Sequence, residues 1–137
     1  MLQIKKRKDG RLKKRFMCTI CFYQDGRHEA PLHWIRKALG IGYVSRRKDG
    51  ISELRINGFR QTREILKNLL PFIRFKRKQA AELYRAASLL CKKRLNRLAK
   101  DELQRLMNCM LVIQNSNYVT KNKKTKAALM KILDLTP

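Results

Sequence analysis

The run LGIGYVSRRKDGISELRI at residues 39–56 constrains the fold more than any other stretch of the chain. Apolar and polar side chains alternate on either side of a Lys-Asp-Gly turn at residues 48–50, a pattern typical of a β-hairpin. We therefore expect strands at residues 43–47 and 51–57. Because strand side chains point alternately to the two faces of a sheet, Leu54 and Ile56 face inward. By the same rule Glu53, Arg55 and Asn57 face outward.

The first part of the chain contains a second pair of alternating segments. Residues 2–23 predict two strands joined at Asp9-Gly10, a dipeptide favoured in hairpin turns. Pro31 then begins a short helix, which ends at Gly40 and Gly42. The resulting order is β-β-α-β-β. It predicts one antiparallel four-stranded sheet with the helix on its apolar face and basic side chains on the opposite face.

After residue 58 the apolar residues recur with the period of a helix. Ile65, Leu66 and Leu69 show this spacing in residues 59–70, and similar patterns predict helices at residues 75–95 and 103–113 and one near the C-terminus. The expected fold class is α+β, a four-stranded antiparallel sheet followed by C-terminal helices. We expect residues 1–137 to form a single domain, with a strand-rich part at about 1–70 and a helical part at about 71–137.

The charge of the chain indicates a polyanionic partner. Its 34 Lys and Arg against 10 Asp and Glu give a net charge of +24, which favours binding to phosphates. No apolar run approaches the roughly 20 residues of a membrane-spanning helix. The start MLQIKKRKDG has no apolar segment typical of a secretory signal. We therefore expect an intracellular protein that binds nucleic acid and no membrane, with reduced cysteines.

Two ordered stretches carry a family resemblance. LGIGYV follows the first helix and precedes a hairpin, and LPFIRFKRKQA opens a later helix. Together with NKKTKAALMKILDL near the C-terminus, this order resembles the single-motif LAGLIDADG homing endonucleases encoded in group I introns. The resemblance implies sequence-specific binding of double-stranded DNA in the major groove, metal-dependent cleavage of a phosphodiester, a homodimer, and a bacterial cytoplasmic or organellar location.

The resemblance also implies which residues face DNA, and the strand alternation independently selects the same positions. Arginine suits guanine, glutamine and asparagine suit adenine, and glutamate suits cytosine. The candidate DNA-binding residues are Gln3, Lys5, Arg7, Arg15, Met17, Thr19, Cys21, Tyr43, Ser45, Arg47, Glu53, Arg55 and Asn57.

The catalytic part of the resemblance is weaker. In the family a helix before the first strand forms the dimer interface and ends in an acidic residue that binds the divalent metal, Mg²⁺ by expectation. Here the first strand begins near Met1, so we expect that helix and its metal ligand to be missing from this chain. The resemblance leaves Gln24 and Lys76 as candidate catalytic residues at the edge of the active site, the first to position water and the second to stabilise negative charge.

The sequence also suggests two other interpretations. Cys18, Cys21, His28 and His33 resemble a shortened zinc-binding pattern, but the odd spacing of the two cysteines places them on opposite faces of one strand. The alternative function is an RNA-binding intron maturase, or another basic RNA-binding protein. A DNA-reading protein should bind duplex DNA in a sequence-dependent way, whereas an RNA-binding protein should prefer folded intron RNA or single-stranded loops.

Overall fold

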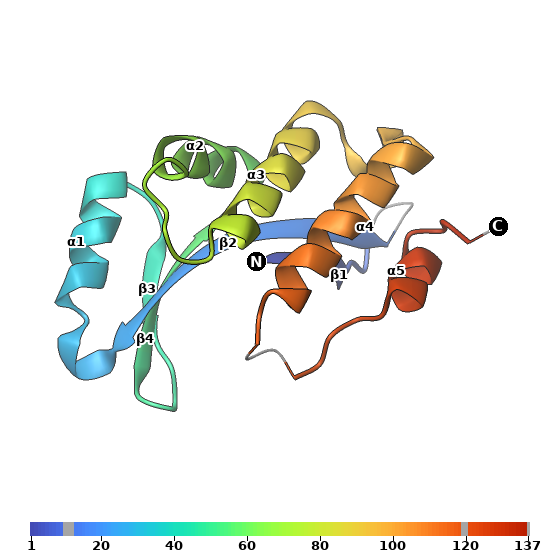
Figure 1. Cartoon of the computed structure of the whole chain (residues 1–137). Helices are drawn as coiled ribbons and strands as arrows, with labels where there is room; N and C mark the ends of the chain where they lie inside the picture. The colour runs from blue at the N-terminus through green and yellow to red at the C-terminus, as the bar shows by residue number, and fades with distance from the viewer. Residues whose placement is uncertain (10–12, 119–120, 137) are drawn as a thin grey trace.

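The computed structural model describes residues 1–9, 13–118 and 121–136. It consists of two hairpins with a helix between them, followed by a helical second half (Figure 1). The strands are β1 (Leu2–Lys6), β2 (Lys14–Asp25), β3 (Tyr43–Arg46) and β4 (Ile51–Asn57). The helices are α1 (Ala30–Leu39), α2 (Phe59–Leu69), α3 (Arg77–Lys92), α4 (Lys100–Asn115) and α5 (Lys126–Ile132), with short 3₁₀ turns at Gly26–His28 and Leu95–Arg97.

The described strands form one antiparallel sheet in the order β1-β2-β4-β3. β2 pairs with β1 over its first part, where Cys18 lies opposite Leu2. It pairs with β4 over its second part, where Thr19 lies opposite Asn57. The predicted β-β-α-β-β arrangement and the α+β class are therefore confirmed. Gly10, in the predicted turn of the first hairpin, lies outside the described residues.

Two helices begin at residues other than those predicted, for local reasons. α3 begins at Arg77 and not at residue 75, because Lys76 has a φ of 55°, a left-handed conformation that a right-handed helix excludes. α4 begins at Lys100 and not at residue 103. There the Glu102 carboxylate accepts a hydrogen bond of 2.9 Å from the backbone N–H of Ala99, which satisfies a donor that the first turn leaves free.

The helices of the second half cover the apolar face of the sheet. α2, α3 and α4 lie side by side on that face (Figure 1). The prediction that the helix beginning near Pro31 covers this face is wrong in its extent, since α1 stands at one end of the sheet and buries only Leu32. Its 10 residues span about 15 Å, whereas the 12 residues of β2 span about 40 Å.

One hydrophobic cluster contains residues of both the strand-rich and the helical part, among them Leu2, Ile56 and Leu129. The expected division at about residue 70 falls in the connection between α2 and α3. Whether the two parts form a single folding unit stays a prediction. Within the described ranges, no helix is both long enough and apolar enough to cross a lipid bilayer.

The buried centre of β4 yields a stability prediction. Ile56 is fully buried under the helices. The substitution Ile56→Ala should therefore lower the free energy of unfolding by about 2–5 kcal/mol, through lost burial and the cavity left behind. Val44→Ala, at a half-buried position of the edge strand β3, is the matched control and should cost less. Denaturant unfolding measures both; equal losses would show that the helices do not pack on β4 as described.

Candidate nucleic-acid interface

The sheet face opposite the helices carries the polar side chains selected by alternation. Residues that pair directly across antiparallel strands share a face. The register pairs Gln3 with Met17, Lys5 with Arg15, Thr19 with Asn57, Cys21 with Arg55, Tyr43 with Arg55 and Ser45 with Glu53. The candidates that lie within strands are thus brought onto one outer face, while their contact with DNA stays a prediction.

Tyr23 shares this outer face but is absent from the predicted set. It lies opposite Glu53 and is 49% exposed. Burial, then a hydrogen bond with Cys21, raises the pKa of Tyr23 to about 12, so its phenol stays protonated and can donate. The alternation of β2 already places Tyr23 outward; only the family resemblance left it out.

Arg55 and Glu53 form an ion pair on the outer face. Arg55 Nε donates to Glu53 Oε1 at 2.6 Å, and this bond raises the pKa of the guanidinium. The Glu53 side chain is only 8% exposed, against 32% for that of Arg55. The geometry therefore does not favour the expectation that Glu53 accepts from cytosine. Its carboxylate instead orients the Arg55 guanidinium.

Thr19 and Asn57 form a second internal contact on this face. Thr19 is 1% exposed, and its hydroxyl donates to Asn57 Oδ1 at 2.8 Å. Thr19 thus has little surface for a ligand, although the sequence made it a candidate. Asn57 is exposed, and with its carbonyl oxygen occupied its amide NH₂ is left to donate.

Two candidate arginines lie just beyond the strands. The first strand was expected to reach Arg7, but β1 ends at Lys6, and the Arg7 guanidinium pairs with Asp9 at 2.9 Å. β3 ends at Arg46, and Arg47 pairs with Asp49 at 2.7 Å in the hairpin turn. Both arginines are exposed near turns, where exposed ion pairs contribute little stability and exchange easily for a phosphate.

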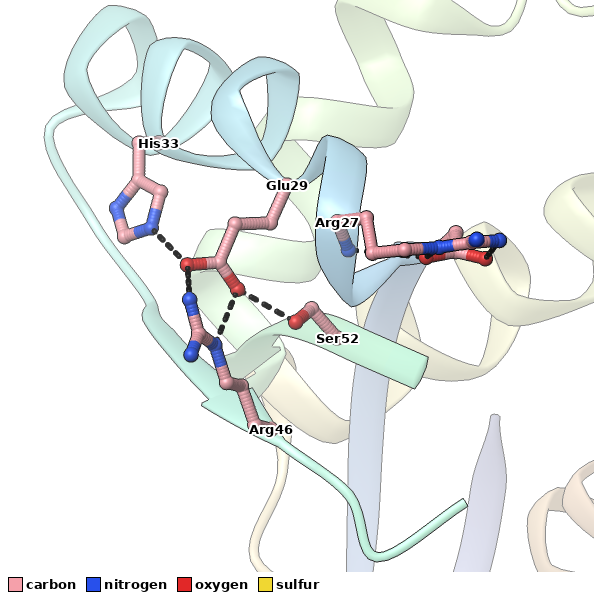
Figure 2. Close-up of polar contacts among 6 residues, drawn as sticks. Arg27, Glu29, His33, Arg46 and Ser52 are labelled. Carbon is pink, nitrogen blue, oxygen red and sulfur yellow. Dashed lines mark hydrogen bonds and ion pairs between the residues drawn. The ribbon is translucent and has the colours of Figure 1, made fainter. Parts of the chain in front are cut away.

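Glu29 anchors the second hairpin to α1. Figure 2 shows its carboxylate between three side chains from different elements. Arg46 donates two hydrogen bonds to it, at 2.7 and 2.9 Å, and the Ser52 hydroxyl donates a third at 2.6 Å. His33 Nε2 lies 3.5 Å from Glu29 Oε1. The bonds from Arg46, then that from Ser52, lower the pKa of Glu29 to about 2.

The two candidate catalytic residues do not line a common cavity in the described structure. Lys76 lines a cavity beside β2 together with Cys21, Tyr23 and the exposed Phe75. Gln24 lies at the exposed end of β2, opposite Ser52, and is not among the residues that line this cavity. Lys76 is thus next to the outer face, while the predicted catalytic roles of both residues remain untested.

The acidic side chains of the chain are all engaged with cations. The ten carboxylates form ion pairs with Arg7, Lys14, Arg27, Arg46, Arg47, Arg55, Arg63, Arg85, Lys93 and Arg105. In the part of the chain that the structure describes, no three His, Cys, Asp or Glu residues converge as metal ligands. The residues present therefore do not fit a Mg²⁺ site.

The zinc interpretation also finds no support in the geometry. Cys18 is fully buried on the helix side of β2, and burial raises the pKa of its thiol to about 12. Cys21 lies half-buried on the outer face. Because the two thiols point to opposite faces, they cannot ligate the same ion through one strand.

Comparison with known proteins gives one curated relative and several solved structures. No protein-family model matches the chain. The DNA endonuclease I-CvuI of Chlorella vulgaris is 36% identical over 78 residues, which are 57% of this chain and 48% of that protein. The matched segment thus spans about half the length of this relative.

The solved structures extend the likeness to nearly the whole chain. A crystal structure of I-CvuI in complex with its target in the presence of 2 mM Ca has a TM-score of 0.71 at 26% identity, covering 98% of this chain and 83% of that one. The archaeal intron-encoded homing endonuclease I-Vdi141I, complexed with DNA, has a TM-score of 0.79 at 19% identity, covering 98% and 85%. The fold is that of the LAGLIDADG homing endonucleases. The resemblance seen in the sequence is confirmed, by I-CvuI in sequence and by these structures in fold.

The Glu29 anchor predicts a pH dependence of stability in the homing-endonuclease-like fold. A carboxyl whose pKa is lowered from 4.5 to about 2 on folding stabilises the fold above pH 4.5. This contribution is lost as the pH falls from 4.5 toward 2. Glu29→Gln should therefore melt below the wild type at pH 6, with the difference in melting temperature shrinking across that window.

Asp25, whose pKa Arg27 also lowers to about 2, titrates in an overlapping range, so only the difference between variant and wild type isolates Glu29. Asp101→Asn, at an exposed carboxylate paired within α4, is the matched control and should change little. A Glu29→Gln difference that stays constant from pH 6 to pH 2 would contradict the anchor.

Proposed function

We propose that this chain binds duplex DNA sequence-specifically through the outer face of its sheet. The proposal rests on the strand order β1-β2-β4-β3 and the register of its pairs. Together they bring polar and cationic side chains onto the face of the sheet that α2, α3 and α4 leave free. The major groove of B-DNA, about 12 Å wide, admits a two-stranded ribbon, and the two hairpins are such ribbons.

Base recognition would come from a few side chains of this face. Arg55, oriented by Glu53, is suited to guanine, which accepts two hydrogen bonds from one guanidinium. Gln3 and Asn57, both exposed, are suited to adenine. Lys5 and Arg15 lie opposite each other on the first hairpin and can contact either phosphate or guanine.

Affinity would come from charge that is not neutralised within the protein. All ten carboxylates are already engaged in ion pairs, and Lys and Arg outnumber them by 24, so most of the positive charge is left to interact with phosphate. Binding of such cations to DNA releases condensed counterions, which makes the affinity fall steeply as salt rises. The relatives support the proposal, since the I-CvuI and I-Vdi141I structures are complexes with DNA.

The curated relative I-CvuI is a DNA endonuclease. The I-CvuI complexes were obtained in the presence of 2 mM Mg or 2 mM Ca, consistent with divalent metal use in the family. The described residues of this chain do not fit such a metal site. For cleavage, this chain's predicted contributions are Lys76 beside β2 and Gln24 at its end. The homodimer, the contact with intron RNA and the bacterial or organellar location stay predictions.

The test of sequence-specific binding is selection from a random-sequence duplex library with the purified chain. The proposal predicts enrichment of one duplex sequence, with weaker binding to a folded RNA of the same length. Preferential retention of the RNA, or duplex binding without any enriched sequence, would contradict it.

Removal of the Arg55 guanidinium should relax specificity at one base pair. With the selected duplex, Arg55→Ala should lose about 1–3 kcal/mol of discrimination at that position, with little change at the others. Arg85→Ala, which removes an arginine paired with Glu82 on α3, is the matched control and should leave the base preference unchanged. Binding to single-base variants of the duplex measures the difference. If discrimination is lost equally at every position, Arg55 does not read a base.

Lysines outside the sheet should contribute to DNA affinity independently of the base sequence. Lys123→Ala, at an exposed position before α5, should weaken binding to all duplexes alike and reduce the slope of log affinity against log salt by about one. Lys92→Ala, at the exposed C-terminal end of α3, is the control. A base-dependent effect of Lys123→Ala, or an equal effect of Lys92→Ala, would contradict this assignment.

A further inference from the structure

The connection between α4 and α5 is strongly basic. We define the basic segment as Lys121, Asn122, Lys123 and Lys124, followed by Lys126 at the start of α5. Its lysines are exposed. The sequence contains no acidic residue between Glu102 and Asp134, and both of those carboxylates pair with other lysines. The segment therefore keeps its positive charge.

The side chain of Gln114 holds this segment through the backbone of one residue. Gln114 Nε2 donates to the carbonyl oxygen of Lys124 at 2.5 Å, and Gln114 Oε1 accepts from the Lys124 N–H at 3.2 Å. The amide thus pairs with both backbone groups of Lys124, as a neighbouring strand would. Directly after this contact the Thr125 hydroxyl accepts from the N–H of Ala128 at 3.2 Å and caps α5.

The other end of the connection is tethered as well. Gln79 of α3 donates from Nε2 to the carbonyl oxygen of Ser116 at 2.9 Å, just after α4 ends at Asn115. Two glutamines from the helical layer therefore fix the described residues on either side of positions 119–120.

The tether places the basic segment beside the edge strand of the sheet. One cavity is lined by Gln114, Asn122 and Lys124 together with Gln3 and Lys5 of β1. Gln3 and Lys5 belong to the outer face that the proposed function assigns to DNA. The segment therefore continues the cationic surface past the edge of the sheet, where the phosphates of a duplex lying on that face would run.

We propose that Gln114 is a positioning residue for DNA binding, which holds the lysines of the basic segment in line with the outer face of the sheet. The inference rests on the proposed function. An untethered lysine loop loses backbone and side-chain entropy when it orders on a ligand. Because the Gln114 tether already orders this segment in the free protein, less entropy is lost on binding. Gln114 therefore affects affinity only through the lysines that it positions.

The test measures duplex affinity and its salt dependence for Gln114→Ala in the full chain. Because the tether comprises two ordinary hydrogen bonds, the variant should bind all duplexes about two- to tenfold more weakly, with a shallower salt slope. Gln104→Ala, at an exposed position of the same helix, is the matched control and should bind as the wild type does. Amide hydrogen exchange should show faster exchange at Lys124 in the Gln114 variant, because its N–H loses an acceptor.

A double-mutant comparison separates positioning from a general loss of structure. In a background in which Lys121, Lys123, Lys124 and Lys126 are all replaced by alanine, Gln114→Ala should have no further effect on affinity. An effect that persists in this background, or a Gln114 variant with wild-type affinity and salt slope, would overturn the inference while leaving the proposed function intact. If the wild-type chain does not bind duplex DNA, the proposed function fails and the inference fails with it.

Discussion

The structure depends on the pairing of one long strand with two partners. β2 is bonded to β1 over its first half and to β4 over its second, so it carries both hairpins into one sheet. Its alternation puts Phe16 and Ile20 under the helices and Arg15 and Met17 on the opposite face. A slip of one residue would exchange the two sets, exposing the core and burying the cations. Stability and the proposed DNA contacts are therefore set by the same register.

The charged side chains fall into two groups, those paired within the fold and those left free for a ligand. The carboxylates are used within the fold: Glu29 ties the second hairpin to α1, Glu53 orients Arg55, and Glu102 satisfies the first turn of α4. Glutamine amides perform a comparable task where a carboxylate would neutralise nearby lysines, as with Gln114 and Lys124. The surplus cations are left on the surface, where a polyanion can compete for them.

The sheet was predictable from the sequence because two local signals agreed: period-two alternation and hairpin turns. Both hairpins, the inward position of Leu54 and Ile56 and the outer-face assignments follow from these signals. What covers the sheet was harder to predict. The helix beginning near Pro31 is adjacent in sequence, but the helices that bury Ile56 come from residues 59–115, and such long-range packing leaves no local pattern.

Contacts between particular side chains could likewise not be predicted from the sequence. Nothing in the pattern around Glu53 distinguishes a base-reading carboxylate from one that orients Arg55; that distinction needs its burial and the 2.6 Å contact. Gln114 and Lys124 lie on either side of the connection between α4 and α5, and no sequence pattern predicts that they pair. The family resemblance, in contrast, was carried by short ordered stretches, and it anticipated the fold confirmed by the solved structures.

The DNA-contacting face can be mapped by methyl NMR of the five methionines, titrated with a duplex selected for binding to the chain. Met17 lies on the outer face opposite Gln3, whereas Met107 and Met110 are buried in α4 on the helical side. If DNA binds through the sheet, the Met17 methyl signal shifts in proportion to bound DNA while those of Met107 and Met110 stay in place. Shifts confined to Met107 and Met110, with Met17 unchanged, would contradict binding through the sheet.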